Sequence, residues 1–167
     1  DSVEFTTDFF PEGSCAIFEG CIVEPGERRL LRFDTLTPNL GNADLFFGAP
    51  ADNEDIFEFS QCHNHFHFES YAAYRVIDLD GHVVADGHKQ AFCLIDTDRI
   101  DPTAGPPQYS CAFQGITRGW GDNYSAGLDC QWVDVTGVPP GEYLLEVVVN
   151  REWVMDELDF TNNFATV

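Results

Sequence analysis

The hydrophobic and polar positions of this chain alternate over short runs, and few segments show the periodicity of a helix. Gly, Pro, Asn and Asp residues separate these runs, as turn formers separate the strands of a sheet. The pattern predicts strands over residues 29–36, 63–68, 71–79, 82–85, 90–95 and 143–150. Asp80 and Gly81 predict a hairpin turn between two of them, and Pro139 to Gly141 predict another turn. We therefore expect a mainly β fold, an antiparallel β-sandwich with long loops.

Residues 96–127 form the longest stretch without clear periodicity, and they are rich in turn formers. We expect a loop region there that packs on the sheets, and long ordered loops often carry function. The chain has 44% hydrophobic residues, including 15 Phe and 3 Trp, which excludes a disordered protein. Because no repeat or linker divides it, residues 1–167 are expected to form a single domain.

Three histidines, His63, His65 and His67, alternate with other residues in one of the predicted strands. Successive side chains of a strand point to opposite faces, so the three imidazoles should share one face, with Phe66 and Phe68 on the other. Three neutral imidazoles can bind copper or zinc and leave further positions open for water or substrate. The motif therefore predicts a catalytic metal site rather than a closed structural one.

The cysteine content indicates disulfides. There are six cysteines, an even number, and no pair has the CxxC spacing of a zinc–thiolate site. Disulfides form in oxidising compartments, so we expect a secreted protein. The alternative is a cytosolic protein with buried, unpaired thiols.

The chain is strongly acidic, with 29 acidic residues, 8 basic residues and a formal net charge of −21. This charge repels nucleic acid and anionic membranes, so neither is expected as a partner, whereas cationic partners are favoured. The acidic residues are spread along the whole chain, which favours a salt-adapted, halophilic surface over a field that steers ligands. No apolar run is long enough to span a bilayer.

Lys89 is the only lysine in the chain. A lysine supplies a primary amine that arginine cannot supply, so a single retained lysine points to covalent chemistry. The alternative is an ordinary surface lysine.

Four motifs occur in the order and approximate spacing of the lysyl oxidase catalytic domain, which this chain resembles over nearly its whole length. The motifs are residues 62–68 (CHNHFHF), 87–94 (GHKQAFCL), 129–135 (DCQWVDV) and 159–163 (DFTNN). The RLLRF segment at residues 29–33 also resembles that family. The acidity favours a microbial, salt-adapted member.

The resemblance implies a copper ion (Cu²⁺) held by His63, His65 and His67, and a lysine tyrosylquinone (LTQ) made from two of the protein's own side chains. The family's cofactor lysine lies in a Gly-His-Lys motif, which places it at Lys89. Its cofactor tyrosine lies six residues before the cysteine of the DCQW motif, which places it at Tyr124. Such an enzyme uses O₂ to convert primary amines, including peptidyl lysine, to aldehydes, and it releases hydrogen peroxide and ammonia.

The sequence does not identify which residue is the base that would take a proton from the substrate. A carboxylate whose pKa is raised by burial would suit this role, and Asp78, Asp122 and Asp129 are the candidates. His88, beside Lys89, is either a proton shuttle or a structural histidine, and His82 is expected to be exposed and uninvolved.

The resemblance also implies the disulfide pairing. Carrying the family's pattern over to this chain pairs Cys15 with Cys62, Cys21 with Cys130, and Cys93 with Cys111. These bridges would tie the N-terminal segment to the histidine motif and to the DCQW motif.

The oxygen-rich segment near the C-terminus predicts a calcium site. Hard cations such as Ca²⁺ prefer oxygen ligands, and the candidates are Glu157, Asp159, Asn162 and Asn163. Relatives bind calcium with this stretch and an N-terminal acidic residue, so Asp1 or its neighbours would complete the site. The alternative is an Asx-rich turn that closes the last strand.

Two alternative functions, each of a different class from the oxidase, remain open. One is a metal-binding extracellular β-sandwich module that never matures its quinone. The other is an acidic adhesion or interaction domain whose histidines bind metal only structurally. Lys89 and Tyr124 discriminate between these readings and the oxidase, because neither alternative needs that pair of residues.

Overall fold

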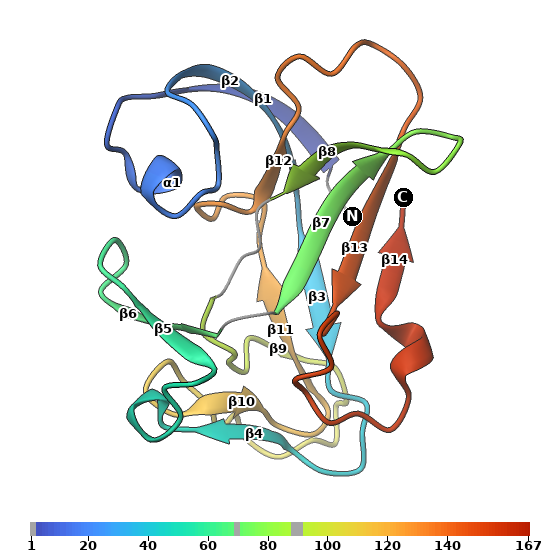
Figure 1. The fold of residues 1–167 in the computed structure, drawn as a ribbon. Coiled ribbons are helices and arrows are strands. Elements are labelled where there is room, and N and C mark those ends of the chain that lie inside the picture. The colour runs from blue at the N-terminus through green and yellow to red at the C-terminus, as the bar shows by residue number, and fades with distance from the viewer. Residues whose placement is uncertain (1–2, 69–70, 88–91) are drawn as a thin grey trace.

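The computed structural model describes residues 3–68, 71–87 and 92–167, and most of its regular structure is strand (Figure 1). One α-helical turn, α1 (Cys15–Phe18), and the 3₁₀ turns Pro50–Asp52 and Phe160–Asn162 are the helical elements of these ranges. The strands are β1 (Val3–Phe10), β2 (Gly26–Phe33), β3 (Thr35–Pro38), β4 (Leu45–Gly48), β5 (Phe57–Ser60), β6 (His65–Phe68), β7 (Ala72–Ile77), β8 (Val83–Gly87), β9 (Asp98–Arg99), β10 (Gln114–Ile116), β11 (Trp120–Tyr124), β12 (Trp132–Asp134), β13 (Leu144–Val149) and β14 (Phe164–Thr166).

The strands of the described ranges pair antiparallel in several small sheets. The largest has the order β14-β13-β7-β8, and two three-stranded sheets have the orders β1-β2-β12 and β3-β11-β9. Two further pairs of strands are the β5–β6 hairpin, at the left of Figure 1, and β4 with β10, which lie below it in the same view. The expected antiparallel β architecture with long loops is therefore confirmed.

The main core lies between the four-stranded sheet and the sheets that contain β2, β11 and β12. Phe33 of β2 meets Tyr74 of β7 edge to face, with ring centroids 4.9 Å apart. Val133 and Leu145 belong to the same buried cluster, as does Tyr124 at the end of β11. Burial of these large side chains supplies the main favourable term for folding.

Several expected strands are present with shorter bounds. The run at residues 29–36 is divided into β2 and β3 at Asp34, whose carboxylate accepts a hydrogen bond from the Ala126 N–H at 2.7 Å. The hairpin turn between β7 and β8 is confirmed, and Gly81 adopts the positive φ of +86° that this turn requires. None of the helices in the described residues is long and apolar enough to cross a membrane.

The strand expected over residues 90–95 is wrong for its described part, residues 92–95. Two of its N–H groups donate to side chains and not to a neighbouring strand: Gln114 Oε1 accepts from the Leu94 N–H at 2.9 Å, and Asp122 Oδ2 accepts from the Ile95 N–H at 3.2 Å. Residues 90 and 91 lie outside the described residues.

The region expected to be loop, residues 96–127, in fact contains β9, β10 and β11. Most of β11 is buried, including Trp120, Asp122 and Tyr124, with only Asn123 exposed. A strand buried on both faces lacks the alternation that marks a strand with one face in water. The missing alternation explains why the sequence pattern did not reveal it.

The three disulfides have the pairing that the resemblance implied, Cys15–Cys62, Cys21–Cys130 and Cys93–Cys111. We call residues 15–21, which begin with α1, the α1 segment. The first disulfide joins its start to the loop between β5 and β6, and the second joins its end, Cys21, to Cys130, two residues before β12. A small second core forms around Cys21, Cys130 and Trp132. The α1 segment is thus fixed to two distant parts of the chain.

Candidate metal centre

The histidine hairpin, which we define as β5 and β6 with the loop between them, carries the three candidate metal ligands. Its strands pair from Phe57 with Phe68 to Ser60 with His65. Asn64 closes the loop in the left-handed conformation with a φ of +55°, and its N–H donates to the Ser60 carbonyl at 2.9 Å. Asn tolerates this conformation better than most residues.

The expectation that all three histidines lie on one strand is wrong for His63. His65 and His67 belong to β6 and share a face, whereas His63 lies in the loop, because the chain turns there. Phe66 packs against Phe59 with ring centroids 5.2 Å apart, as a residue on the opposite face should.

The three imidazoles nevertheless converge. The ring centroids of His63 and His65 lie 5.7 Å apart, those of His63 and His67 5.2 Å, and those of His65 and His67 5.0 Å. Burial and the neighbouring His63 lower the pKa of His65, which favours the neutral imidazole that binds metals. The turn brings His63 over the strand face that the other two rings occupy.

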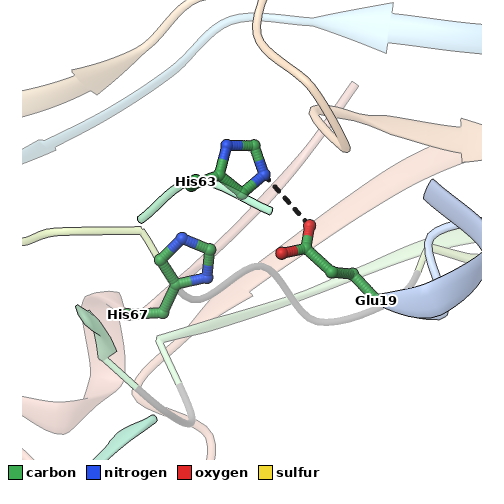
Figure 2. Close-up of side chains that lie close together, drawn as sticks. All are labelled: Glu19, His63 and His67. Carbon is green, nitrogen blue, oxygen red and sulfur yellow. Dashed lines mark hydrogen bonds and ion pairs between the residues drawn. The ribbon is translucent and has the colours of Figure 1, made fainter. Parts of the chain in front are cut away.

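Glu19, which directly follows α1, places a carboxylate beside these rings, a contact that was not predicted from the sequence. Figure 2 shows the Glu19 carboxylate facing His63 and His67, with its Oε2 3.0 Å from His63 Nε2. The Ser60 hydroxyl donates to Glu19 Oε1 at 2.5 Å and accepts from the His63 N–H at 3.1 Å. One signal for Glu19 was available: the expected Cys15–Cys62 bridge places the segment after Cys15 beside His63.

This donor set fits a borderline divalent metal. Three donor atoms, one each from Glu19, His63 and His67, all lie within 4.8 Å of one another. The His65 ring lies next to that of His67. Imidazole nitrogen and carboxylate oxygen are both common ligands of copper and zinc. The side chains of Glu19 and His63 are 17% and 20% exposed, so an ion could reach them from solvent.

Tyr124, the expected cofactor tyrosine, ends β11 in the main core, and we call β11 the tyrosine strand. Its hydroxyl lies 2.6 Å from Asp122 Oδ2 and 2.9 Å from the Cys93 carbonyl oxygen. Burial raises the pKa of Asp122 to about 7 and raises the pKa of Tyr124 well above its usual range. Asp122 Oδ1 is buried and has no hydrogen-bond partner among the described residues. Asp122 and Tyr124 thus share a hydrogen bond in a buried site, where the raised pKa lets the Asp122 carboxyl gain or lose a proton near neutral pH.

The Phe92 ring connects the two candidate sites. It stacks on Tyr124 with centroids 4.9 Å apart, and it contacts His67 with centroids 5.9 Å apart. Lys89, the expected cofactor lysine, and His88 lie outside the described residues. Phe92 is nonetheless only three positions after Lys89 in the sequence.

The three candidate bases differ sharply in their surroundings. Asp122 contacts the Tyr124 hydroxyl. Asp78 instead closes the turn between β7 and β8, where the His82 N–H and side chain bind it and lower its pKa, and Asp129 is exposed. The expectation that His82 is exposed is confirmed.

The expected calcium ligands are occupied mainly with one another and with their own loop. Glu157 Oε1 accepts from the side-chain amides of Asn163, at 2.9 Å, and Asn150. Asp159 accepts from the Thr161 N–H at 2.8 Å and caps the last 3₁₀ turn. These contacts agree with the turn-closing alternative, and the calcium site stays a prediction. Asn162 lies in the same 3₁₀ turn, and Asp1 lies outside the described residues.

Comparison with known proteins extends the likeness over most of the chain. The family model described as lysyl oxidase matches residues 15–167. Lysyl oxidase homolog 4 of Homo sapiens is 42% identical over 161 residues, which cover 89% of this chain and 21% of the relative. Lysyl oxidase homolog 2 of Rattus norvegicus is 40% identical over 163 residues, covering 89% and 20%, and lysyl oxidase homolog 3 of Homo sapiens is 39% identical over 161 residues, covering 89% and 21%. The chain thus spans about a fifth of the length of these relatives. This chain belongs to the lysyl oxidase family.

Proposed function

We propose that this protein is a secreted, copper-dependent amine oxidase that carries a lysine tyrosylquinone. It converts primary amines, including the lysine side chains of peptides, to aldehydes, consumes O₂, and releases hydrogen peroxide and ammonia. Membership of the lysyl oxidase family supports a function of the copper amine oxidase type. The observation that carries the proposal is the contact of Phe92 with both His67 and Tyr124, which puts a metal-donor group next to a buried phenol.

His63, His65 and His67 would hold the copper, and Lys89 and Tyr124 would form the quinone. A bound copper ion supplies redox chemistry with O₂, and the quinone supplies a carbonyl that accepts electrons from the amine. The protein's own contribution at Tyr124 is to exclude water and to hold a proton acceptor. Phe92 and Tyr71 cover the Tyr124 ring, and Asp122 Oδ2 is placed to take the hydroxyl proton.

The charge of the protein suits this class of substrate. Primary amines are cations at neutral pH, and the formal charge of −21 attracts them at low ionic strength. The same charge would keep a salt-adapted protein soluble. The effect of salt on amine affinity separates these two roles, because only electrostatic attraction of the amine weakens when salt screens the charge. Secretion is supported by the three disulfides, which are typical of oxidising compartments.

The deciding experiment compares copper-free protein with protein loaded with Cu²⁺ under air, after reduction and digestion with trypsin. Trypsin cleaves after Arg75, Arg99, Arg118 and Arg151 but not after a modified lysine. A matured enzyme should therefore yield residues 76–99 joined to residues 119–151 and should release peroxide from a simple alkylamine. Separate, unmodified peptides and no peroxide would overturn the proposal and favour the metal-binding module without a quinone.

A further inference from the structure

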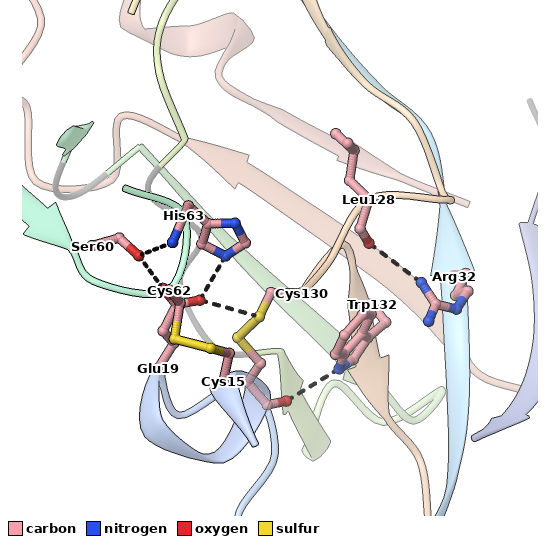
Figure 3. Close-up of a disulfide and its surroundings, with 10 residues drawn as sticks. Cys15, Glu19, Arg32, Ser60, Cys62, His63, Leu128, Cys130 and Trp132 are labelled. Carbon is pink, nitrogen blue, oxygen red and sulfur yellow. Dashed lines mark hydrogen bonds and ion pairs between the residues drawn. A yellow bond between two sulfur atoms is a disulfide. The ribbon is translucent and has the colours of Figure 1, made fainter. Parts of the chain in front are cut away.

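Glu19 occupies a position that the disulfides fix relative to the histidine hairpin. It lies between Cys15 and Cys21, which are bonded to Cys62 and Cys130 respectively. Cys62 directly precedes His63, so a covalent bridge holds the segment before Glu19 against the first histidine (Figure 3). The approach of Glu19 to His63 is therefore built into the covalent framework.

The carboxylate itself is held in one orientation. Ser60, which is 9% exposed, donates its hydroxyl proton to Glu19 Oε1, which turns Oε2 toward the imidazoles. Among the described residues, the ion pair of Glu19 is with His63, and no arginine takes part. Burying a carboxylate that has no permanently charged cation beside it costs free energy of folding. A metal cation bound next to the carboxylate would offset that cost.

The distances suit two ligands of one ion. Ligand atoms about 2.0–2.2 Å from a shared metal, at angles near 90–110°, lie about 3–3.5 Å apart. Glu19 Oε2 and His63 Nε2 are 3.0 Å apart, and the whole group with His67 lies within 4.8 Å. The same separation also suits a hydrogen bond, in which Glu19 would only orient His63.

We propose that Glu19 is a direct ligand of the metal ion that the histidines bind, so that the centre combines imidazole nitrogens with one carboxylate oxygen. This inference rests on the metal site of the proposed function. An anionic oxygen ligand stabilises divalent copper relative to monovalent copper, because it offsets more of the higher charge. Ser60 then acts as the positioning residue that keeps the carboxylate turned toward the ion.

The test uses the full chain with Glu19→Gln, and with Glu58→Gln as a matched control. Glu58 is an exposed carboxylate of β5 that pairs with His67 across the hairpin, so its loss changes the local charge equally. We expect Glu19→Gln to weaken Zn²⁺ and Cu²⁺ binding, measured by chelator competition, by at least about tenfold. Glu58→Gln should weaken it by no more than about threefold. Equal losses in the two variants would overturn the proposal.

Copper EPR separates a ligand from an orienting neighbour. Glu19→Gln should change the parallel g value and hyperfine splitting of bound Cu²⁺, and Glu19→His should move both toward an all-nitrogen site. A Glu19→Gln spectrum that matches the wild type would overturn the proposal and leave Glu19 as an orienting residue. Wild-type protein that binds no copper would overturn the proposed function as well.

A measurement on the unaltered protein covers the case in which the variants misfold. Protein labelled with ¹³C at the side-chain carboxyl of glutamate should show a strong carbon coupling to bound Cu²⁺ in pulsed EPR. The coupling should persist in labelled Glu58→Gln protein. Its absence from the wild type would overturn the proposal.

Discussion

The histidine hairpin and the tyrosine strand hold their functional side chains in opposite ways. The hairpin is a two-stranded sheet whose partly exposed donors are fixed by a disulfide, a turn and the Ser60 hydroxyl. The tyrosine strand pairs with β3 and β9, and Tyr124 is only 4% exposed. The difference suits their proposed roles, because a metal ion must enter from water whereas a phenol that is to be oxidised selectively is best shielded from it.

Replacement of the proposed cofactor tyrosine should have the largest effect. Tyr124→Phe keeps the ring in the core but removes the hydroxyl, so we expect complete loss of quinone staining and of peroxide release, with copper binding unchanged. Tyr71→Phe is the matched control, because Tyr71 is an equally buried neighbour with a ring centroid 5.1 Å from Tyr124. Retained activity in Tyr124→Phe would remove this residue from the cofactor.

Removal of the hairpin's disulfide should affect the metal site more than the tyrosine site. Cys15→Ser with Cys62→Ser opens a bridge that spans 47 residues, and we expect a loss of about 4 kcal/mol in the free energy of unfolding. Copper affinity should fall at least about tenfold, as for loss of a supporting contact. Chemical denaturation and chelator competition measure the two effects. Unchanged copper affinity would show that the hairpin and Glu19 stay aligned without the bridge.

The buried carboxyl of the tyrosine strand should make stability depend on pH. Because burial raises the pKa of Asp122 to about 7, the folded state binds a proton that the unfolded chain releases near pH 4. The contribution of Asp122 is therefore full below about pH 4 and is lost as the pH rises to about 7, by up to about 4 kcal/mol.

Asp122→Asn should remove this dependence, because the amide stays neutral and still accepts the Tyr124 hydrogen bond. Urea unfolding of metal-free protein between about pH 4 and 7.5 measures it, and the variant should gain stability relative to the wild type as the pH rises. A difference that does not change with pH would contradict the raised pKa. Asp78→Asn is a suitable comparison, because the pKa of Asp78 is lowered by its turn.

The smallest expected effect concerns Ser60. Ser60→Ala leaves Glu19 Oε1 without its hydroxyl donor, and we expect copper affinity to fall by about threefold to tenfold, which is the typical net contribution of one hydrogen bond. The Tyr124 site should not respond. A change in quinone formation at saturating copper would contradict this expectation. It would show that the histidine hairpin and the tyrosine strand are coupled although they belong to different sheets.

The sequence predicted strands that alternate between core and solvent better than it predicted a strand that is buried on both faces. Strands with one face in water, such as β7 and β13, show alternation or a long β-branched run and were found close to their bounds. The tyrosine strand was missed because Trp120, Asp122 and Tyr124 are all buried, so polarity does not alternate along it. Alternation of polar and apolar residues arises when one face of a strand is exposed to water. A strand that is buried on both faces therefore lacks this signal.

The same limit applies to the candidate site. Residues close in sequence, such as His65 and His67, were placed together correctly by strand geometry. The position of His63 was not, because it depends on a turn closed by Asn64 in an uncommon conformation. Glu19 lies 44 positions before His63, and its approach depends on side-chain and disulfide contacts that have no local pattern. The distinction between the three candidate aspartates likewise required knowledge of burial.

The bridge between Cys15 and Cys62 has a consequence for the order of maturation. Until that bond closes, nothing covalent keeps Glu19 near the histidines, and the chain between them must be ordered by weak contacts alone. Oxidation of the thiols should therefore precede metal loading, and metal loading should precede any chemistry at Tyr124. We therefore expect a chain with reduced thiols to bind copper less tightly than the oxidised chain.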